Sequence, residues 1–342
     1  MERASAGATI TKIRAIHGRM LTQEDYRILA SKKTVAQVAQ YLMEHKRFSD
    51  VLSGINVNTI HRGYLEELIV KSNFEMFLKL RDFQHLKHAE FYNSVCLKYE
   101  TQQLLSLIDS IFSKTRASFI SGFPAFLINN TKLDFVELSK CASLQELCSK
   151  LGCTQYRKPM EQIASLGDNA DYLTCEVILR TFYYKKLMSS VKNDLSKSDA
   201  TLISSAIRSE LDVRNIVNAY RMKKYFGAGS EEIRSKQLPF TKLGKAKMEK
   251  LYECTTDTEM VEYVRKTSKA AATLFDRSDF IETEMAKINL RSARKLLRTQ
   301  SMPAVFYAFL QLCDVEAANI VHIIEGIRYE LPREKIEELI AY

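Results

Sequence analysis

The sequence contains one pattern three times, and this repetition limits the possible folds more than any other feature. In each copy an aromatic residue or Met stands three positions before a Leu, a Ser/Thr-x-x-Glu/Gln box begins five positions after it, and apolar residues follow at +9 and +13. The copies are Tyr26, Leu29, Thr34, Gln37, Val38 and Leu42; Phe135, Leu138, Ser143, Glu146, Leu147 and Leu151; and Met248, Leu251, Thr256, Glu259, Met260 and Val264.

The chemistry of this pattern predicts the end of one helix, a short turn and the start of another. The hydroxyl accepts a hydrogen bond from an amide in the first helical turn, and the Glu or Gln reaches back to the amide of the cap residue. The last two apolar positions are four apart and therefore share one helical face.

A second element also recurs three times and opens long helix-like stretches. Its copies are Gly63-Tyr64-Leu65, Asp171-Tyr172-Leu173 and Asp279-Phe280-Ile281, with the aromatic positions 108 residues apart. An acid-x-x-amide signature follows after 36, 40 and 36 residues, and four extra residues correspond to about one helical turn. The signatures are Glu100 with Gln103, Asp212 with Asn215, and Glu316 with Asn319. They have two compatible interpretations: residues that line an axial opening, or acids at helix starts with hydrogen-bonded amides between helices, which we favour.

The order of these elements predicts three helical units, with the chain beginning partway through one of them. The expected boundaries are 1–61 for N-terminal helices that complete the third unit, 62–165 and 166–278 for the first two units, and 279–342 for the third. Closing the third unit against the N-terminus gives an all-α ring or funnel with pseudo-threefold symmetry. In this circularly permuted order the third unit is built from both ends of the chain, which is feasible where the chain ends lie close together.

Composition agrees with an all-helical globular protein. The chain of 342 residues has only 11 Gly and 5 Pro, which disfavours sandwiches, barrels and glycine-rich nucleotide folds. Its longest apolar run, 304–313, is too short for a membrane span, and no secretory signal is recognisable. Seven cysteines without a CxxC pair indicate buried thiols in a reducing compartment, so we expect a cytoplasmic protein.

Motifs for catalysis or cofactors are missing from the sequence. Gly244-Lys245 lacks the remainder of a phosphate-binding loop, and Gly227-Ala228-Gly229 is typical of a helix stop. His85 and His88 could meet on one helical turn as metal ligands, but their charged neighbours favour a solvated face. We therefore expect no metal and no cofactor, and an enzyme is the least favoured class.

The chain has a net charge of +9, and four of its basic residues are predicted to share one helical face. Arg291, Arg294, Lys295 and Arg298 recur at i, i+3, i+4 and i+7. This face could meet an acidic protein, lipid phosphates or nucleic acid, or could simply be solvated. The shorter runs at 32–33, 45–47 and 221–224 are expected to be solvated faces.

Ordered residues along nearly the whole chain resemble a known family, the C subunit of V/A-type rotary ATPases, which corresponds to the d subunit of the eukaryotic enzyme. The resemblance is carried by Ile13-Arg14-Ala15, Met20-Leu21, Tyr26, Leu29, Thr34-Val35, Val38 and Tyr41-Leu42; by Asn215-Ile216, Tyr220-Arg221 and Lys223; and by Glu316, Asn319-Ile320, Glu325-Gly326-Ile327-Arg328-Tyr329 and Leu331-Pro332. Gln103 departs from the Asn of the other two signatures.

The resemblance implies a non-catalytic, all-helical funnel on the cytoplasmic side of the membrane. It would receive the central stalk, built from D- and F-type subunits, and rest on the proteolipid ring, with the large membrane stator subunit as a further possible neighbour. No nucleic acid and no transmembrane segment are implied. The signature residues and the basic face are then the candidate interface residues. The alternative from the residues alone is a basic helical nucleic-acid-binding or scaffold protein, whose nucleic-acid affinity would fall steeply with salt.

Overall fold

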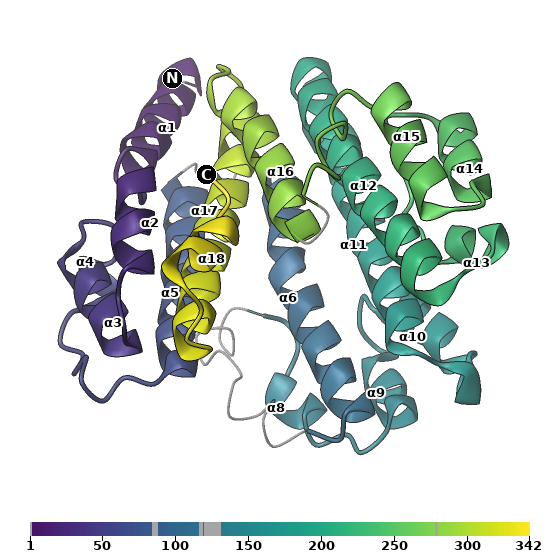
Figure 1. Ribbon diagram of the computed structural model, residues 1–342, viewed down its shortest axis with the longest axis horizontal. Helices are drawn as coiled ribbons and strands as arrows, with labels where there is room; N and C mark the ends of the chain where they lie inside the picture. Colours follow the sequence, from purple (N-terminus) through teal and green to yellow (C-terminus); the bar gives the residue numbers. More distant parts are fainter. Residues whose placement is uncertain (1, 84–87, 116–118, 120–130, 278–279) are drawn as a thin grey trace. The chain divides into compact units, whose positions relative to one another are not determined.

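A computed structural model describes residues 2–83, 88–115, 119, 131–277 and 280–342. All regular secondary structure in these residues is helical, which confirms the all-α prediction (Figure 1). The helices are α1 (Glu2–His17), α2 (Gln23–Ala30), α3 (Val35–Glu44), α4 (Ser49–Leu52), α5 (Arg62–Phe83), α6 (Ala89–Phe112), α8 (Phe135–Leu138), α9 (Leu144–Leu151), α10 (Arg157–Ala164), the 3₁₀ turn η2 (Gly167–Asn169), α11 (Tyr172–Asp194), α12 (Lys197–Phe226), α13 (Ser230–Ser235), α14 (Lys245–Glu253), α15 (Asp257–Thr267), α16 (Ile281–Leu297), α17 (Met302–Arg328) and α18 (Arg333–Glu338).

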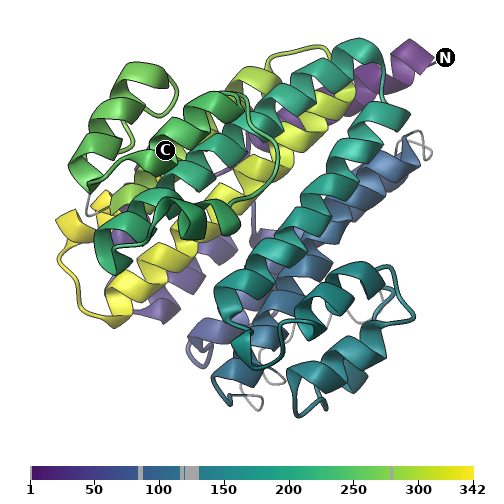
Figure 2. The ribbon, with the colours of Figure 1, turned by 90° about the vertical axis from the view of Figure 1, so that its right-hand side faces the viewer.

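The chain folds into two compact units. Unit 1 comprises residues 1–87, 196–217 and 258–342, and unit 2 comprises 88–195 and 218–257. In unit 2, α6 packs along α11 and α10 lies against α9, while α13 packs on α14 (Figure 2).

The repeated helix pair is confirmed in all three copies. Each pair consists of two helices joined by a short turn: α2 and α3, α8 and α9, and α14 and α15. The four apolar positions of each copy are all buried. They are Tyr26, Leu29, Val38 and Leu42; Phe135, Leu138, Leu147 and Leu151; and Met248, Leu251, Met260 and Val264.

The helix caps in the first two copies depart from the prediction in the same way. The Thr34 hydroxyl accepts from the Gln37 amide, as expected, but the Gln37 side chain accepts from the amide of Lys33, one residue before the cap. Ser143 and Glu146 repeat both contacts in the second copy. The prediction that these side chains reach the cap amide itself is therefore wrong.

The contact differs with the length of the acidic or amide side chain. At α2, where Asp25 takes the place of Glu or Gln, the shorter side chain accepts from the amide of the cap residue Thr22 at 2.7 Å. Glu and Gln carry one more methylene group, and they bond one amide further back.

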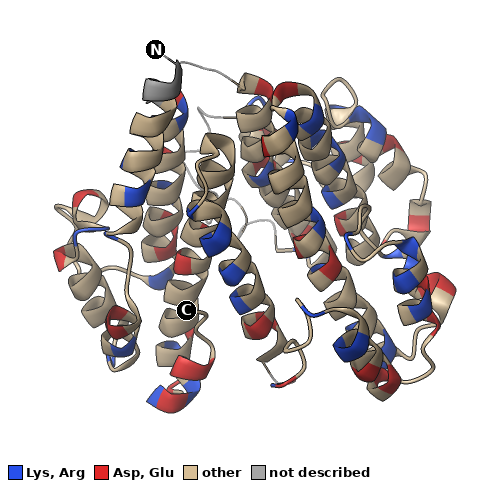
Figure 3. Ribbon diagram, turned by 90° about the horizontal axis from the view of Figure 1, so that it is seen from above, with Lys and Arg blue, Asp and Glu red and all other residues tan. Residues whose placement is uncertain are grey.

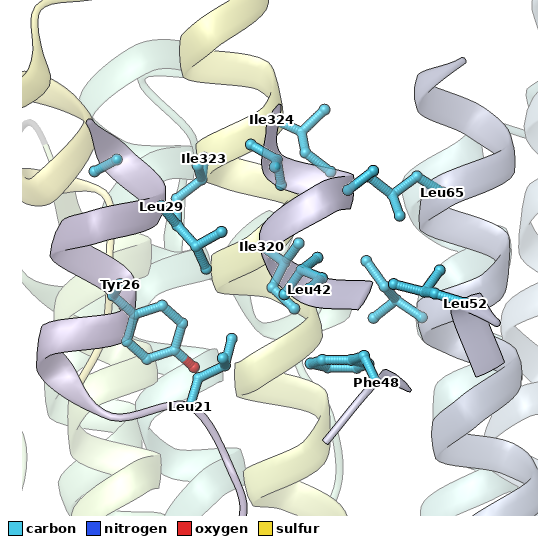
Figure 4. Close-up of a cluster of buried hydrophobic side chains, with 14 of the residues drawn as sticks. Leu21, Tyr26, Leu29, Leu42, Phe48, Leu52, Leu65, Ile320, Ile323 and Ile324 are labelled. Carbon is cyan, nitrogen blue, oxygen red and sulfur yellow. The ribbon is translucent and has the colours of Figure 1, made fainter. Parts of the chain in front are cut away.

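The N-terminal helices of unit 1 share a hydrophobic core with its C-terminal helices (Figure 4). Tyr26 and Leu29 of α2 and Leu42 of α3 cluster with Ile320 and Ile324 of α17. Helix α18 packs on both α2 and α17. Residues from the two ends of the sequence thus bury one another.

Helix α17 is the most apolar long helix. An 18-residue window within it has a mean hydropathy of 1.4, and among the described residues it alone is long and apolar enough to cross a membrane. However, 67% of that window is buried inside the protein, where α17 packs against α16, α1 and α5. Its apolar character is that of a core helix.

Candidate functional site

The acid-x-x-amide signatures lie in the interior of long helices. Glu100 is in α6, Asp212 in α12 and Glu316 in α17, each well past the first turn. The interpretation of these acids as helix-start residues is wrong. In each predicted unit the second long helix runs through the signature without a break, so the helix dipole is not what stabilises the carboxylates.

Glu316 is the centre of a buried polar network in unit 1. Arg47 Nε donates to Glu316 Oε2 at 3.0 Å, and both side chains are only 1% exposed. The Leu21 amide donates to Glu316 Oε1 at 2.8 Å. One carboxylate therefore binds two points of the N-terminal segment to α17.

Arg47 extends the same network to α5. Its Nη1 donates to Ser72 Oγ at 3.1 Å, and Nη2 donates to Asn73 Oδ1. Asn73 in turn donates from Nδ2 to the carbonyl of Cys313 in α17 at 3.0 Å. The prediction that the basic run 45–47 is solvated is wrong for Arg47, because its guanidinium donates to three partners in the interior.

Burial dominates the electrostatics of Glu316. Desolvation raises the pKa of its carboxyl above the usual range, while Arg47 and the Leu21 amide act in the opposite direction. The carboxylate is therefore held by few specific partners in a site that disfavours charge. Losing one of these partners would leave a buried group poorly compensated.

The other members of the signatures are also mostly buried. In unit 2, Glu100 accepts from the Tyr156 hydroxyl at 2.8 Å and from Gln155 Nε2 at 3.1 Å. Asp212 and Asn215 are 5% and 3% exposed. Gln103, the departure from the amide pattern, is only partly buried.

The side-chain amide of Asn319 binds the backbone of a single residue with both its donor and its acceptor. Its Nδ2 donates to the carbonyl of Ala341 at 2.7 Å, and its Oδ1 accepts from the amide of the same residue at 2.9 Å. The side chain thus pairs with a stretch of backbone as a second peptide group would. This contact fixes residues that follow α18 onto α17.

The predicted basic face is present on α16 and its C-cap, and its four cations are exposed. Figure 3 colours the Lys and Arg positions along the helices blue. The side chains concerned are Arg291, Arg294, Lys295 and Arg298. Arg14 of α1 adds a further cation near the end of the helix, where it donates to the carbonyls of Leu297 and Thr299. A cation at a helix C-terminus is electrostatically favourable.

A pocket of about 330 Å³ lies beside this face in unit 1. It is lined by α1, α2, α16 and α17 and includes His17, Tyr26, Arg294 and Glu316. Burial and the nearby Arg294 lower the pKa of His17, so the imidazole is disfavoured as a second cation.

A metal centre is not evident in the part of the chain that the structure describes. No group of three or more His, Cys, Asp or Glu side chains gathers there. His85, one of the two predicted candidates, lies outside the described residues. His88 Nδ1 is 2.7 Å from the carbonyl of Asp194.

The repeated helix pair and the buried signature residues define an all-helical protein. Its buried polar side chains join helices to one another. The sequence model of the ATP synthase (C/AC39) subunit family matches residues 9–339. The chain therefore belongs to this family of V/A-type ATPase subunits, as the resemblance indicates. Its members are structural, non-catalytic subunits.

Two curated relatives are named as the C subunit of an A-type ATP synthase. The one from Methanosarcina mazei is 24% identical over 240 residues, which cover 63% of this chain and 58% of the relative. The one from Methanosphaera stadtmanae is 23% identical over 225 residues, which cover 62% and 53%. The matched part thus spans less than two thirds of either relative.

Sequence reasoning missed two residues that complete the signatures. Arg47 and Tyr156 are the partners of Glu316 and Glu100, and each is distant from its carboxylate in the sequence. A buried acid inside an apolar helix demands a partner, so the need for one is predictable. Its identity is not, because it depends on which helices meet.

Proposed function

We propose that this chain couples the rotor of a V/A-type rotary ATPase to its membrane sector. In this proposal it receives the lower end of the central stalk, made of D- and F-type subunits, and rests on the cytoplasmic side of the proteolipid ring. The large membrane stator subunit is a further neighbour. The protein contributes no chemistry, cofactor or metal site, and torque for ion transport passes through it.

The observation that carries this proposal is the family match over residues 9–339. The internal repetition supports the shape that a socket needs. The helix pair occurs three times with the same twelve apolar positions buried, and the first pair packs on α17, the last long helix. We propose that residues 1–61 complete the unit formed by 279–342, and that with 62–165 and 166–278 they form a funnel around an axis.

A joint that transmits torque needs many simultaneous contacts, because a single strong contact acts as a pivot. We therefore expect an interface larger than the roughly 1,600 Å² of an ordinary complex. In this proposal the signature residues hold the wall helices in place beneath the contacting surface. They are the buried Glu100, Asp212, Asn215, Glu316 and Asn319 and the partly buried Gln103. The exposed residues Arg291, Arg294, Lys295 and Arg298 contribute a basic part of that surface.

The test is assembly from purified components. The tagged full chain is mixed with the D- and F-type stalk subunits and, separately, with the detergent-solubilised proteolipid ring of the same organism. We expect co-elution with both. Single alanine changes on the basic face should each weaken stalk or ring binding by less than about tenfold, and the fourfold change should weaken it far more.

The matched control is the double variant Lys245→Ala/Lys247→Ala, which removes two exposed cations from α14. It should bind as the unmodified protein does. Failure of the folded chain to bind the stalk pair would refute the proposal. Tight binding of nucleic acid that disappears steeply with salt would instead support the alternative class.

A further inference from the structure

The C-terminal end of α12 presents two aromatic rings to solvent. Phe226 is 79% exposed, more than any other large apolar side chain among the described residues, and Tyr225 is 65% exposed. The helix stops immediately afterwards at Gly227, which has φ +61°, and the Ala228 amide donates to the Met222 carbonyl. This confirms the predicted helix stop. The rings are therefore held at a fixed helix end.

Three cations precede or adjoin these rings in the last two turns of the helix. Arg221 and Lys224 are exposed and Lys223 is half-buried. Lys224 Nζ lies 5.5 Å from the centroid of the Tyr225 ring. Positions 213–230 contain no Asp or Glu, and the next acids in the sequence are Glu231 and Glu232 of α13. Asp257 also lies near enough to Lys224 to interact with its ammonium group. The end of α12 is thus both apolar and positively charged.

The third signature helix ends in a related but weaker way. Arg328 and Tyr329 follow Glu316 by 12 and 13 residues, as Lys224 and Tyr225 follow Asp212. Tyr329 is also 65% exposed, and the Arg328 guanidinium lies 5.4 Å from its ring centroid. Here, however, Glu325 and Glu330 flank the ring. The end of α17 therefore serves as an internal comparison with mixed charge.

We propose that the end of α12, defined by Arg221, Lys223, Lys224, Tyr225 and Phe226, binds the surface of an anionic phospholipid membrane. Aromatic side chains partition to the headgroup level, and neighbouring Lys and Arg side chains bind lipid phosphates. A protein partner is a poorer match, because Lys is depleted at protein interfaces, whereas here two lysines directly precede the two aromatic residues.

This inference rests on the proposed function in one respect, since a rotary ATPase would bring this helix end to a membrane. Lipid binding is nevertheless separable from assembly, because the stalk and ring can bind through other surfaces. A lipid contact at this point would add a second attachment to the membrane beside the protein ring. It would also give the cations at the end of α12 a specific use.

The chain contains no Trp, which allows a local test. The variant Phe226→Trp places the only tryptophan of the chain at an exposed position, where the larger indole ring has room. The full-length variant is titrated with vesicles of phosphatidylglycerol and with vesicles of phosphatidylcholine. We expect a blue shift of the emission with the anionic vesicles, no shift with the neutral ones, and loss of the shift as salt is raised.

Two further variants test which residues provide the attraction. In the Phe226→Trp background, Lys223→Gln/Lys224→Gln should lower the vesicle affinity about 25-fold, since each lysine near an anionic surface contributes roughly fivefold. Lys245→Gln/Lys247→Gln removes the same charge from α14 and should leave the affinity unchanged. In a separate protein, Tyr329→Trp should give a much smaller shift.

Three results would overturn the inference. They are an absent shift with anionic vesicles, equal shifts with both lipids, and a shift produced only by the solubilised proteolipid ring, which would indicate a protein partner. Stalk binding is measured on the same variant. Loss of the lipid response with intact stalk binding refutes the lipid contact alone, and absent stalk binding with an intact lipid response refutes the proposed function.

Discussion

The buried pair of Arg47 and Glu316 allows a quantitative test of how unit 1 is held together. Removing either partner alone, by Arg47→Met or Glu316→Leu, leaves the other group buried without its main partner. We expect each single change to lower the free energy of unfolding of unit 1 by about 3–5 kcal/mol. If the effects were additive, the double variant would lose about 6–10 kcal/mol.

The double variant should lose less than this sum, about 2–6 kcal/mol. Two apolar side chains of similar size can fill the space, so no unpaired charge remains. The remaining cost comes from the Leu21 amide and the side-chain oxygen Oδ1 of Asn73, which lose their partners, at about 1–3 kcal/mol each. The expected coupling energy is therefore about 4 kcal/mol.

The assay is urea unfolding followed by circular dichroism, together with native-state hydrogen exchange of the α17 amides, which reports on unit 1 specifically. If the single variants fail to fold, recovery of the folded state in the double variant also shows that the two residues are coupled. A double variant as unstable as the sum of the single ones would show that the pair is not coupled, and the reasoning would be wrong.

Two further predictions concern packing and pH. Gly326→Ala places a methyl group 2.6 Å from Ile336 Cγ1 and should destabilise unit 1 by about 1–3 kcal/mol, whereas Gly7→Ala, with open space around it, should be neutral or stabilising; thermal unfolding compares the two. Burial alone would raise the pKa of Asp25, but hydrogen bonds from the Thr22 hydroxyl and other donors hold it below its usual 3.8. The ionised Asp25 therefore stabilises the folded state above pH 3.8, and this stabilisation is lost as pH falls through the pKa of Asp25 in the folded protein. Asp25→Asn should therefore cost about 1 kcal/mol near neutral pH and nothing well below pH 3.8, and a constant cost across this range would contradict the assignment.

The helix pairs could be predicted from the sequence because their determinants are local. A cap residue, a Glu or Gln three positions later and two apolar residues four apart all lie within one short segment, as in Thr34 to Leu42. The same is true of the basic face at 291–298, where four exposed cations follow the helical period. The second contact of the cap was mispredicted, because two neighbouring amides lie within reach of the Glu or Gln side chain and the sequence does not select between them.

The buried networks could not be predicted, because they depend on tertiary contacts. Arg47 stands in a basic run that is typical of a solvated face, and its partner Glu316 is 269 residues away. Similarly, nothing near Glu100 in the sequence identifies Tyr156 as its donor. The arrangement of three units around an axis stays a prediction, since it concerns how the two compact units combine.

The core shared by α2, α3 and α17 has a consequence for synthesis on the ribosome. Leu42 emerges 278 residues before Ile320, so at about 5–20 residues per second roughly 15–60 s separate their translation. During that interval the apolar faces of α2 and α3 are not covered by α17, and a chaperone that binds exposed apolar segments would bind these two helices. Synthesis of α17, and not the appearance of the first helices, then sets when this part of the molecule becomes stable.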